Sequence, residues 1–283
     1  MRKRTRTPDP SRTTMIRQAF MREINKRSRK LRGAVNAYIR EKDVFGLTEV
    51  TPGLRQNVYA RQYEFHTDSR KVKEFRKWFQ GQVDQGILEV GTQDAAWTHE
   101  YVDSSYKKGV TRAYVDTNKD ILAESTSFYE GGKAQFLTSS FASAEAVSKI
   151  ELIYTRVFDG LTGYTAQMSQ ETSRILATGL SNGWGAGKVA LEMNRRISAL
   201  TKKRALTIAR TEIIYAHAEG QLDSFEKLGV KELGIQAEWS TAGDDRVCAE
   251  CSSMDGHIFT VAEARGLIPL HPNCRCAWIP YRR

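Results

Sequence analysis

Apolar residues recur every three, four or seven positions over most of the chain, which is the spacing of one face of an α-helix. The clearest stripe predicts a helix over residues 15–40 and comprises Ile16, Phe20, Ile24, Leu31, Val35 and Tyr38. Similar spacing predicts helices from Ser69 to Gly86, within 92–117, over 188–200 and over 203–228. The sequence therefore predicts a body built mainly from helices.

The region 142–180 predicts either one long helix or a helical hairpin bent near Gly160 and Gly163. The Ser-Asn-Gly sequence at 181–183 is a suitable stop signal, because glycine readily takes the left-handed conformation that ends many helices. Two stretches lack a clear helical period. Residues 45–66 predict a loop followed by a strand or hairpin, and residues 118–141 are mixed, with a break at Gly131-Gly132.

The pattern changes after Gly229. Apolar and polar residues alternate over 235–239, which is typical of a strand, and residues 257–260 and 276–281 predict two more strands around a helical turn at 261–266. The expected fold class is α+β: a mostly helical N-terminal body with a small C-terminal α+β domain clasped by a Cys/His metal site. We expect a basic disordered arm at 1–14, a helical domain at 15–165 and a C-terminal domain at 166–283.

The positive charge is concentrated near the N-terminus. The chain has a formal charge of +10, and residues 1–40 contain 13 Lys/Arg but two acids. Such an arm predicts contact with nucleic acid or an acidic partner, through Arg2, Lys3, Arg4, Arg6 and Arg12, although a solubilising tail explains it equally well. No run of about 18 apolar residues is present, which excludes a transmembrane helix, and no apolar segment follows the basic start as in a secretory signal.

All four cysteines fall near the C-terminus as two close pairs, Cys248 with Cys251 and Cys274 with Cys276. Two pairs, each on a turn, offer four thiolates in the tetrahedral arrangement that Zn²⁺ prefers. His271 is an alternative ligand, because Pro272 holds it extended close to Cys274. We expect a closed, structural zinc site; disulfides and free thiols remain the other options.

A carboxylate interrupts the small and apolar stripe of the helix at 203–228. Glu212 needs a partner if it is buried, and Arg210 cannot reach it because residues two apart on a helix diverge. Arg246 or Arg275, which flank the cysteines, are the expected partners. We expect these four residues to dock the cysteine region onto the helix.

Two short patterns raise an enzymatic alternative. His217-Ala-Glu219 followed by Cys248-Ala-Glu-Cys251 resembles the signature of zinc-dependent deaminases, but Val247 replaces its proline and the second cysteine pair would have no role. Ser125-Thr-Ser127 with Gln236-Ala-Glu238 resembles elements of ADP-ribosyltransferases. A zinc-dependent deaminase or nuclease acting on nucleic acid is therefore kept as the alternative to a protein that is not an enzyme.

Several motifs in the C-terminal part follow one another in a recognisable order. They are Ala209-Arg-Thr-Glu212, Ala216, Gly220, Trp239, the stretch from Thr241 to Cys251, Asp255-Gly256, and Pro269-Leu-His-Pro-Asn-Cys-Arg-Cys276. Together they resemble the phage Mu protein F-like family of minor head (head morphogenesis) proteins, over about residues 165–283.

The resemblance implies a minor capsid protein of a tailed phage. Such proteins associate with the portal vertex and capsid interior inside the head, assist head assembly and the packaging or delivery of DNA, and have no established enzymatic activity. It implies a location in the virion, after assembly in the host cytoplasm. Some relatives carry toxin domains after this module, and we expect none here. The basic arm would contact packaged DNA, and residues 15–165 would contact the portal.

Overall fold

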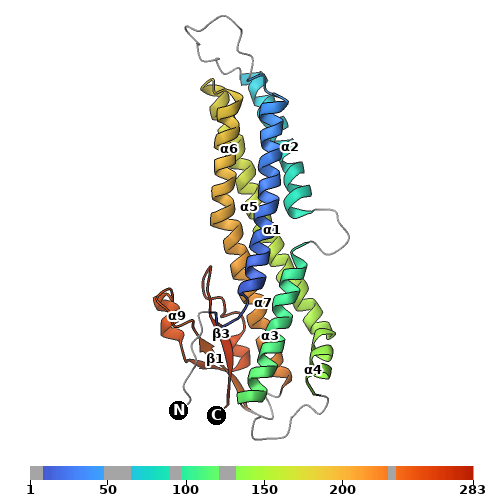
Figure 1. Ribbon diagram of the computed structural model, residues 1–283, viewed down its shortest axis with the longest axis vertical. Helices are drawn as coiled ribbons and strands as arrows, with labels where there is room; N and C mark the ends of the chain where they lie inside the picture. Colours follow the sequence, from blue (N-terminus) through green and yellow to red (C-terminus); the bar gives the residue numbers. More distant parts are fainter. Residues whose placement is uncertain (1–8, 48–64, 90–96, 121–131, 229–233, 283) are drawn as a thin grey trace, which may run out of the picture. The chain divides into compact units, whose positions relative to one another are not determined.

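The computed structural model describes residues 9–47, 65–89, 97–120, 132–228 and 234–282. Helices make up most of these residues, and a three-stranded antiparallel sheet lies near the C-terminus (Figure 1). The predicted α+β fold class, with a helical body and a small C-terminal α+β region, is confirmed. No helix among the described residues is both long and apolar enough to cross a membrane.

The chain divides into two compact units that are discontinuous in sequence. Unit 1 comprises Met1–Phe20, Trp97–Val157 and Thr207–Arg283, and unit 2 comprises Met21–Ala96 and Phe158–Leu206. The domains predicted from the sequence, 1–14, 15–165 and 166–283, are contiguous segments and do not follow this division. The predicted boundaries of the arm and of the two domains stay a prediction.

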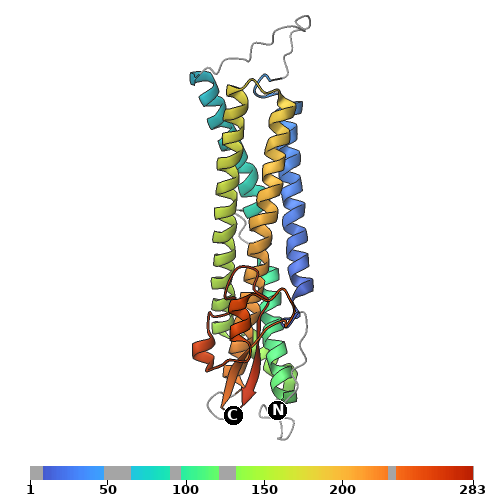
Figure 2. The ribbon, with the colours of Figure 1, turned by 90° about the vertical axis from the view of Figure 1, so that its left-hand side faces the viewer.

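Unit 2 is a bundle of helices that lie side by side (Figures 1 and 2). It contains most of α1 (Thr14–Asn36) with the π-helical turn η1 (Ala37–Glu41), α2 (Phe65–Val83) with η2 (Asp84–Leu88), the second half of α5 (Ala144–Ser181), and α6 (Ala186–Leu200) with η3 (Thr201–Ala205). Its core is apolar and includes Ile24, Leu31, Phe79, Leu176, Val189 and Met193. A buried hydroxyl chain from Ser28 through Thr201 to Tyr164 joins α1, η3 and α5.

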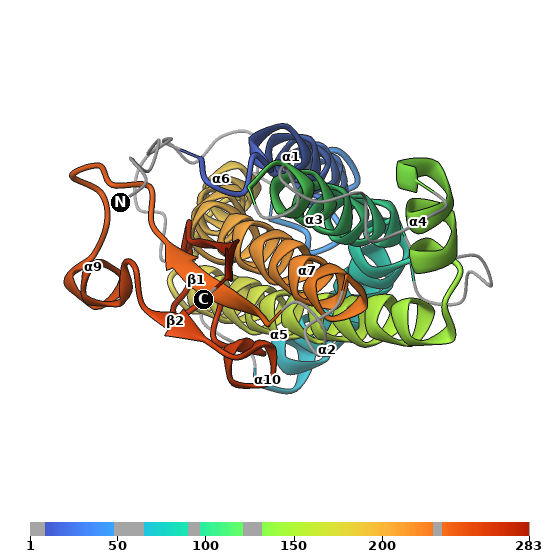
Figure 3. The same ribbon diagram turned by 90° about the horizontal axis from the view of Figure 1, so that it is seen from below.

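Unit 1 is organised around α7 (Leu206–Lys227), which lies between α3 (His99–Asp120) and the sheet (Figure 3). Two glycines set the closeness of the α3–α7 crossing. A Cβ atom on Gly109 would lie 2.1 Å from the backbone oxygen of His217, and one on Gly220 would lie 2.2 Å from that of Tyr106. Because atoms cannot approach so closely, only glycine allows this packing. α4 (Gly132–Phe141) and the first half of α5 complete the helical part.

The sheet of unit 1 has the strand order β2-β1-β3 and is fully antiparallel. The strands are β1 (Ile235–Ser240), β2 (Ile258–Phe259) and β3 (Ala277–Arg282). Trp239 faces Trp278 in the register, both side chains are fully buried, and their rings meet edge to face at 5.3 Å. The buried side-chain amide of Gln221, on α7, bonds both backbone groups of Trp278. Its Nε2 donates to the Trp278 oxygen at 2.7 Å, and its Oε1 accepts from the Trp278 N–H at 3.1 Å. These contacts fix the sheet on α7.

Several predicted elements change in extent. Residues 144–181 form one unbroken helix, so the hairpin alternative is wrong, and Gly183 ends that segment with a φ of 63°. Phe65, predicted in a strand, begins α2, and the helix predicted to stop at Gly86 continues to Leu88 as a π-helical turn. Residues 48–64 and 121–131, where a hairpin and a mixed segment were predicted, lie outside the described residues. The short helices α9 (Ala249–Met254) and α10 (Val261–Ala264) flank β2.

Candidate metal centre

Cys248 and Cys251 are placed by the start of α9. Cys248 occupies the N-cap position in an extended conformation, and its sulfur accepts the backbone N–H of Cys251 at 3.3 Å. A sulfur used as a cap directs both thiols to the same end of the helix, because one turn separates them. Cys248 is exposed and Cys251 is buried, so the pair reaches from the surface into the protein.

His271 and Cys274 belong to a tight turn before β3. The backbone N–H of Cys274 donates to the oxygen of His271 at 3.1 Å, and Asn273 takes a left-handed φ of 64°. The Nδ1 atom of His271 lies 2.9 Å from the oxygen of Pro272. Because a carbonyl only accepts, Nδ1 is the donor in this contact, which raises the pKa of His271. Nε2 is then the ring nitrogen left to bind a metal. This orientation is typical of a histidine that binds a metal.

The five side chains of the Cys/His cluster (Cys248, Cys251, His271, Cys274 and Cys276) meet in one place. The Nε2 atom of His271 lies 3.1 Å from the sulfurs of Cys248 and Cys251, and the sulfurs of Cys251 and Cys274 are 3.8 Å apart. Within the described part of the chain, two sets of three residues have ligand atoms close enough to share an ion: Cys248, Cys251 and His271, and Cys251, Cys274 and Cys276. Cys251 belongs to both.

These distances fit a small ion with soft ligands. A tetrahedral site with Zn–S bonds of about 2.3 Å separates its sulfurs by about 3.8 Å, as observed between Cys251 and Cys274. The two His271 contacts at 3.1 Å would open by about half an ångström on binding, since Zn–N bonds are about 2.0 Å. The residues present therefore fit a metal, with five donors available for four positions.

The protonation of the thiols follows their surroundings. A hydrogen bond from the Cys276 thiol lowers the pKa of Cys274 to about 5, and donating that bond raises the pKa of Cys276. Burial raises the pKa of Cys251 to about 12, whereas the backbone N–H of Cys251 lowers the pKa of Cys248. The four thiols thus lie in unequal surroundings, and a bound cation would favour the thiolate form of all of them.

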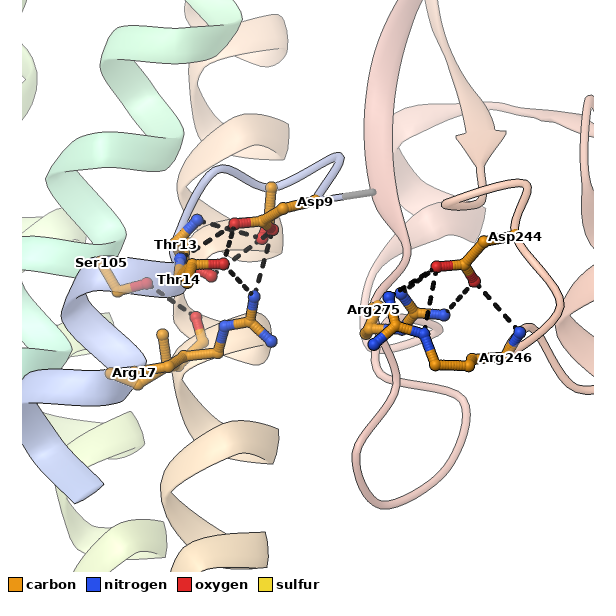
Figure 4. Close-up of polar contacts among 10 residues, drawn as sticks. Asp9, Thr13, Thr14, Arg17, Ser105, Asp244, Arg246 and Arg275 are labelled. Carbon is orange, nitrogen blue, oxygen red and sulfur yellow. Dashed lines mark hydrogen bonds and ion pairs between the residues drawn. The ribbon is translucent and has the colours of Figure 1, made fainter. Parts of the chain in front are cut away.

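The residues predicted to support the cysteines are arranged differently from the prediction. Arg275 forms a bidentate pair with Asp244, at 2.8 and 2.5 Å, and Arg246 bonds the same carboxylate at 2.8 Å (Figure 4). These arginines hold the pKa of Asp244 well below its usual range. Neither reaches Glu212.

Glu212 is paired instead with Arg156 of α5, whose Nε lies 3.3 Å from its carboxylate. Burial raises the pKa of Glu212, and the arginine opposes that effect. Arg156 also stacks over the ring of Tyr215 at 4.1 Å. The pairing with Arg246 or Arg275 is therefore wrong. The sequence could not identify Arg156, because it lies 56 positions away on a helix with its own apolar stripe.

The docking of the cysteine region onto α7 uses Asn273. Its side-chain oxygen accepts from Arg210 at 3.4 Å, and its backbone N–H donates to Thr211 at 3.2 Å. Arg210 thus contacts the turn that holds His271 and Cys274. The Pro-Asn pair at 272–273 is a turn signal that could have identified Asn273, because asparagine tolerates the left-handed conformation.

A second anchor was missed by the sequence analysis. Arg265, at the end of α10, bonds three acids on α7 at 2.6 to 3.0 Å, namely Glu219, Asp223 and Glu226. The N–H of Gly266 also donates to Glu219 at 3.1 Å. The acids share one helix face by their spacing of four and three residues, a pattern that signals a basic partner from another segment.

The predicted arm is described only from residue 9 onward. Arg2, Lys3, Arg4 and Arg6 lie outside the described residues, and Arg12 is exposed with a φ of 54°. Residues 9–13 form a turn with several local hydrogen bonds, and the disorder expected of residues 1–14 stays a prediction. Asp9 accepts from the backbone N–H of Thr14 at 2.9 Å and pairs with Arg17 at 3.2 Å (Figure 4). The turn therefore caps the start of α1.

The structure does not bring together the residues of the deaminase-like pattern, and it describes only part of the ADP-ribosyltransferase-like pattern. His217 is fully buried on α7, belongs to neither of the metal-capable sets of described residues, and has its pKa lowered to about 3 by burial. Glu219 is engaged by Arg265 and the N–H of Gly266. The deaminase arrangement of His217, Cys248 and Cys251 around one ion is therefore wrong. Ser125 to Ser127 lie outside the described residues, and Glu238 lies in β1 opposite Ile279.

Comparisons with known proteins agree with the motifs. Residues 170–279 match the family described as Phage Mu protein F like protein. The chain is also 33% identical over 118 residues to the "Minor head protein GP7" of Bacillus phage SPP1. That stretch spans 37% of this chain and 38% of the relative, well under two thirds of its length. No solved structure matches. The region that contains α6, α7 and the Cys/His cluster is thus similar to the phage Mu protein F-like minor head proteins, as its motifs predict.

Proposed function

We propose that this chain is a minor head protein of a tailed phage that acts in head morphogenesis without being an enzyme. It associates with the portal vertex inside the head and assists the packaging or delivery of DNA. The observation that carries the proposal is the match of residues 170–279 to the Phage Mu protein F-like family, together with the similarity of 118 residues to a protein named as a minor head protein. The contacts of Glu219 and the buried position of His217 favour no enzymatic alternative.

We further propose that the Cys/His cluster holds one structural Zn²⁺. Three cysteine sulfurs and an imidazole, or four sulfurs, are the donor sets of structural zinc sites. The ion would join the start of α9, the His271 turn and the start of β3. It would cross-link the segments 241–260 and 269–276, which contribute no large apolar side chain to the buried core.

Assembly tests the proposed role. The full chain is co-expressed with the portal and major capsid proteins of the same genome, and the particles are separated by sedimentation. We expect the chain in particles made with portal and its absence from particles made without it. A chain that stays soluble in both cases, or enters both equally, contradicts the portal association.

Metal content tests the cofactor separately. Elemental mass spectrometry of the purified chain should find one zinc per chain, and Cys251→Ser should lose it because Cys251 belongs to both ligand sets. The zinc content of the His271→Ala and Cys276→Ser variants, measured in parallel, shows which of the two residues is the fourth ligand. His217→Ala should retain the metal. Zinc in the Cys251→Ser variant, or its absence in the unmodified chain, contradicts the proposed site.

A further inference from the structure

The two units carry very different charges. Unit 2 contains 22 Lys/Arg and 13 Asp/Glu, a net charge of +9, whereas unit 1 contains 21 and 20, a net charge of +1. Residues 21–40 alone contribute seven basic residues and one acid. The excess attributed to the N-terminal arm therefore extends along α1 into unit 2.

The basic residues of α1 gather on its outer face. Each residue of an α-helix turns by about 100°, so positions separated by three, four or seven share a sector. The inner sector is occupied by Ile24, Leu31 and Val35, which are buried. The opposite sector and its continuation in η1 form what we call the α1 basic face, made of five exposed side chains: Arg22, Lys26, Arg29, Lys30 and Arg40.

Most of these charges are not neutralised by any residue that the structure describes. Lys26 pairs with Glu23 at 3.3 Å, but Arg22, Arg29, Lys30 and Arg40 form no ion pair among the described residues. More positive charge lies alongside. Thr201 bonds Ser28 of α1 at 2.8 Å, and the next residue, Lys202 of η3, is exposed. A surface with this excess attracts polyanions.

The face suits a phosphate backbone better than a protein partner. Protein interfaces are centred on buried apolar and aromatic side chains. The large apolar side chains that are exposed in the described chain include none between residues 21 and 41. Contacts to nucleic-acid phosphates need only positive charge and hydrogen-bond donors, which arginine and lysine supply.

The dimensions agree with such a contact. Residues 22–40 span about 27 Å along the helix axis, at about 1.5 Å per residue. Phosphates follow one another at about 3.4 Å of rise along each strand of a duplex, so the face extends over about eight base pairs. We propose that the α1 basic face binds the phosphate backbone of duplex DNA without sequence preference. The inference refines the proposed contact with packaged DNA by placing it on unit 2 and not on the arm alone.

Binding of the full chain to a labelled 30-base-pair duplex tests the proposal, with fluorescence anisotropy measured over a range of salt concentrations. The variant Arg22→Gln/Arg29→Gln/Lys30→Gln/Arg40→Gln should bind at least tenfold more weakly in 100 mM salt. Its slope of log affinity against log salt should be shallower by about three to four, because each lost phosphate contact removes about 0.9. Circular dichroism and thermal melting should be unchanged, since all four side chains are exposed.

Two matched variants locate the effect. Arg70→Gln/Lys73→Gln/Arg76→Gln/Lys77→Gln removes the same charge from exposed positions of α2, where Glu74 interrupts the basic residues. Arg2→Gln/Lys3→Gln/Arg4→Gln/Arg6→Gln removes it from the arm. We expect less than a threefold change from the α2 variant. An equal loss from the α2 variant, or a loss from the arm variant alone, overturns the proposal.

Poly-glutamate of matched charge distinguishes nucleic acid from an acidic protein. Tighter binding of poly-glutamate than of the duplex would overturn the assignment to DNA. The outcome is independent of the proposed function, because particle incorporation is scored separately. A face variant that enters particles but does not bind DNA supports the present inference, whereas a chain that binds DNA but never enters particles contradicts only the head role.

Discussion

Unit 2 and the C-terminal part of unit 1 are stabilised in different ways. In unit 2, long helices bury side chains such as Leu176, Val189 and Met193 completely. In residues 234–282, the elements are short and their apolar core is small, centred on Trp239 and Trp278. Contacts between polar groups, such as Arg275 with Asp244, hold the remaining segments around a cluster of potential metal ligands. Burial of apolar surface is insensitive to chelators and to mild acid, whereas ligand and proton equilibria are not. The comparison therefore predicts which conditions affect which region.

Metal removal should have the largest effect and should be confined to the C-terminal region. Structural zinc contributes about 10–16 kcal/mol of folding free energy in zinc-finger peptides at pH 7, and the top of that range is a ceiling for the effect here. After chelation, hydrogen exchange should accelerate in β1, β3 and α9 but not in α6. The Cys251→Ser variant should show the same pattern without chelator. Uniform acceleration in both units would contradict the comparison.

The second-largest effect should come from shortening a buried side chain in the core of unit 2. Leu176→Ala removes a fully buried side chain from α5 and should lower the free energy of unfolding by about 2–5 kcal/mol, from lost burial and the cavity left behind. Leu191→Ala on α6, where the side chain is 49% exposed, is the control and should change it little. Urea unfolding measures both, and zinc content should stay the same. A loss of zinc in the Leu176→Ala variant would show that the regions depend on one another.

At the α3–α7 crossing of unit 1, replacing Gly109 or Gly220 by a residue with a side chain should lower the stability of the protein. Gly220→Ala should destabilise the protein by about 1–3 kcal/mol, because the added Cβ meets the backbone oxygen of Tyr106. Gly163→Ala provides a matched change in α5, where no atom lies within 4 Å of the new Cβ. That variant should stabilise by up to about 1 kcal/mol through helix propensity. Equal effects of the two substitutions, measured by thermal melting, would remove the steric explanation.

Acid should lower the free energy of unfolding of unit 1, because the buried His217 resists protonation in the folded state. Its pKa is about 3 in the folded protein, and the ordinary value is 6.5, because burial disfavours the charged ring. Between these values the unfolded chain binds a proton that the folded chain does not, so stability is complete above pH 6.5 and falls as the pH drops. The expected slope is about 1.4 kcal/mol per pH unit, or about 2 kcal/mol from pH 6.5 to 5. Denaturant unfolding measures the free energy of unfolding at each pH, and the His217→Gln variant should lack the part of the pH dependence that His217 causes. Identical pH profiles for the variant and the unmodified chain would contradict this role of His217.

The sequence predicted the elements whose cause is local. Helices α1, α6 and α7, the strand β1 and the members of the Cys/His cluster follow from periodicity and from spacing. Contacts between distant segments were not predictable in the same way. Nothing near Glu212 indicates Arg156, and nothing near Gln221 indicates that its amide bonds the backbone of Trp278. Such partners depend on how helices pack, and the pattern along one helix contains no information about its neighbour's register.

The discontinuity of the units has a consequence for synthesis on the ribosome. All segments of unit 2 have been made once residue 206 is complete, so its bundle can form while translation continues. Unit 1 requires residues from 207 onward in addition to its two earlier segments, so α3 must wait for α7 with its binding surface uncovered. Domains generally fold as units in the order in which they emerge. Unit 1, which contains the segment nearest the N-terminus, would therefore be the later of the two units to fold, and the surface of α3 around Gly109 would stay exposed until α7 has been made.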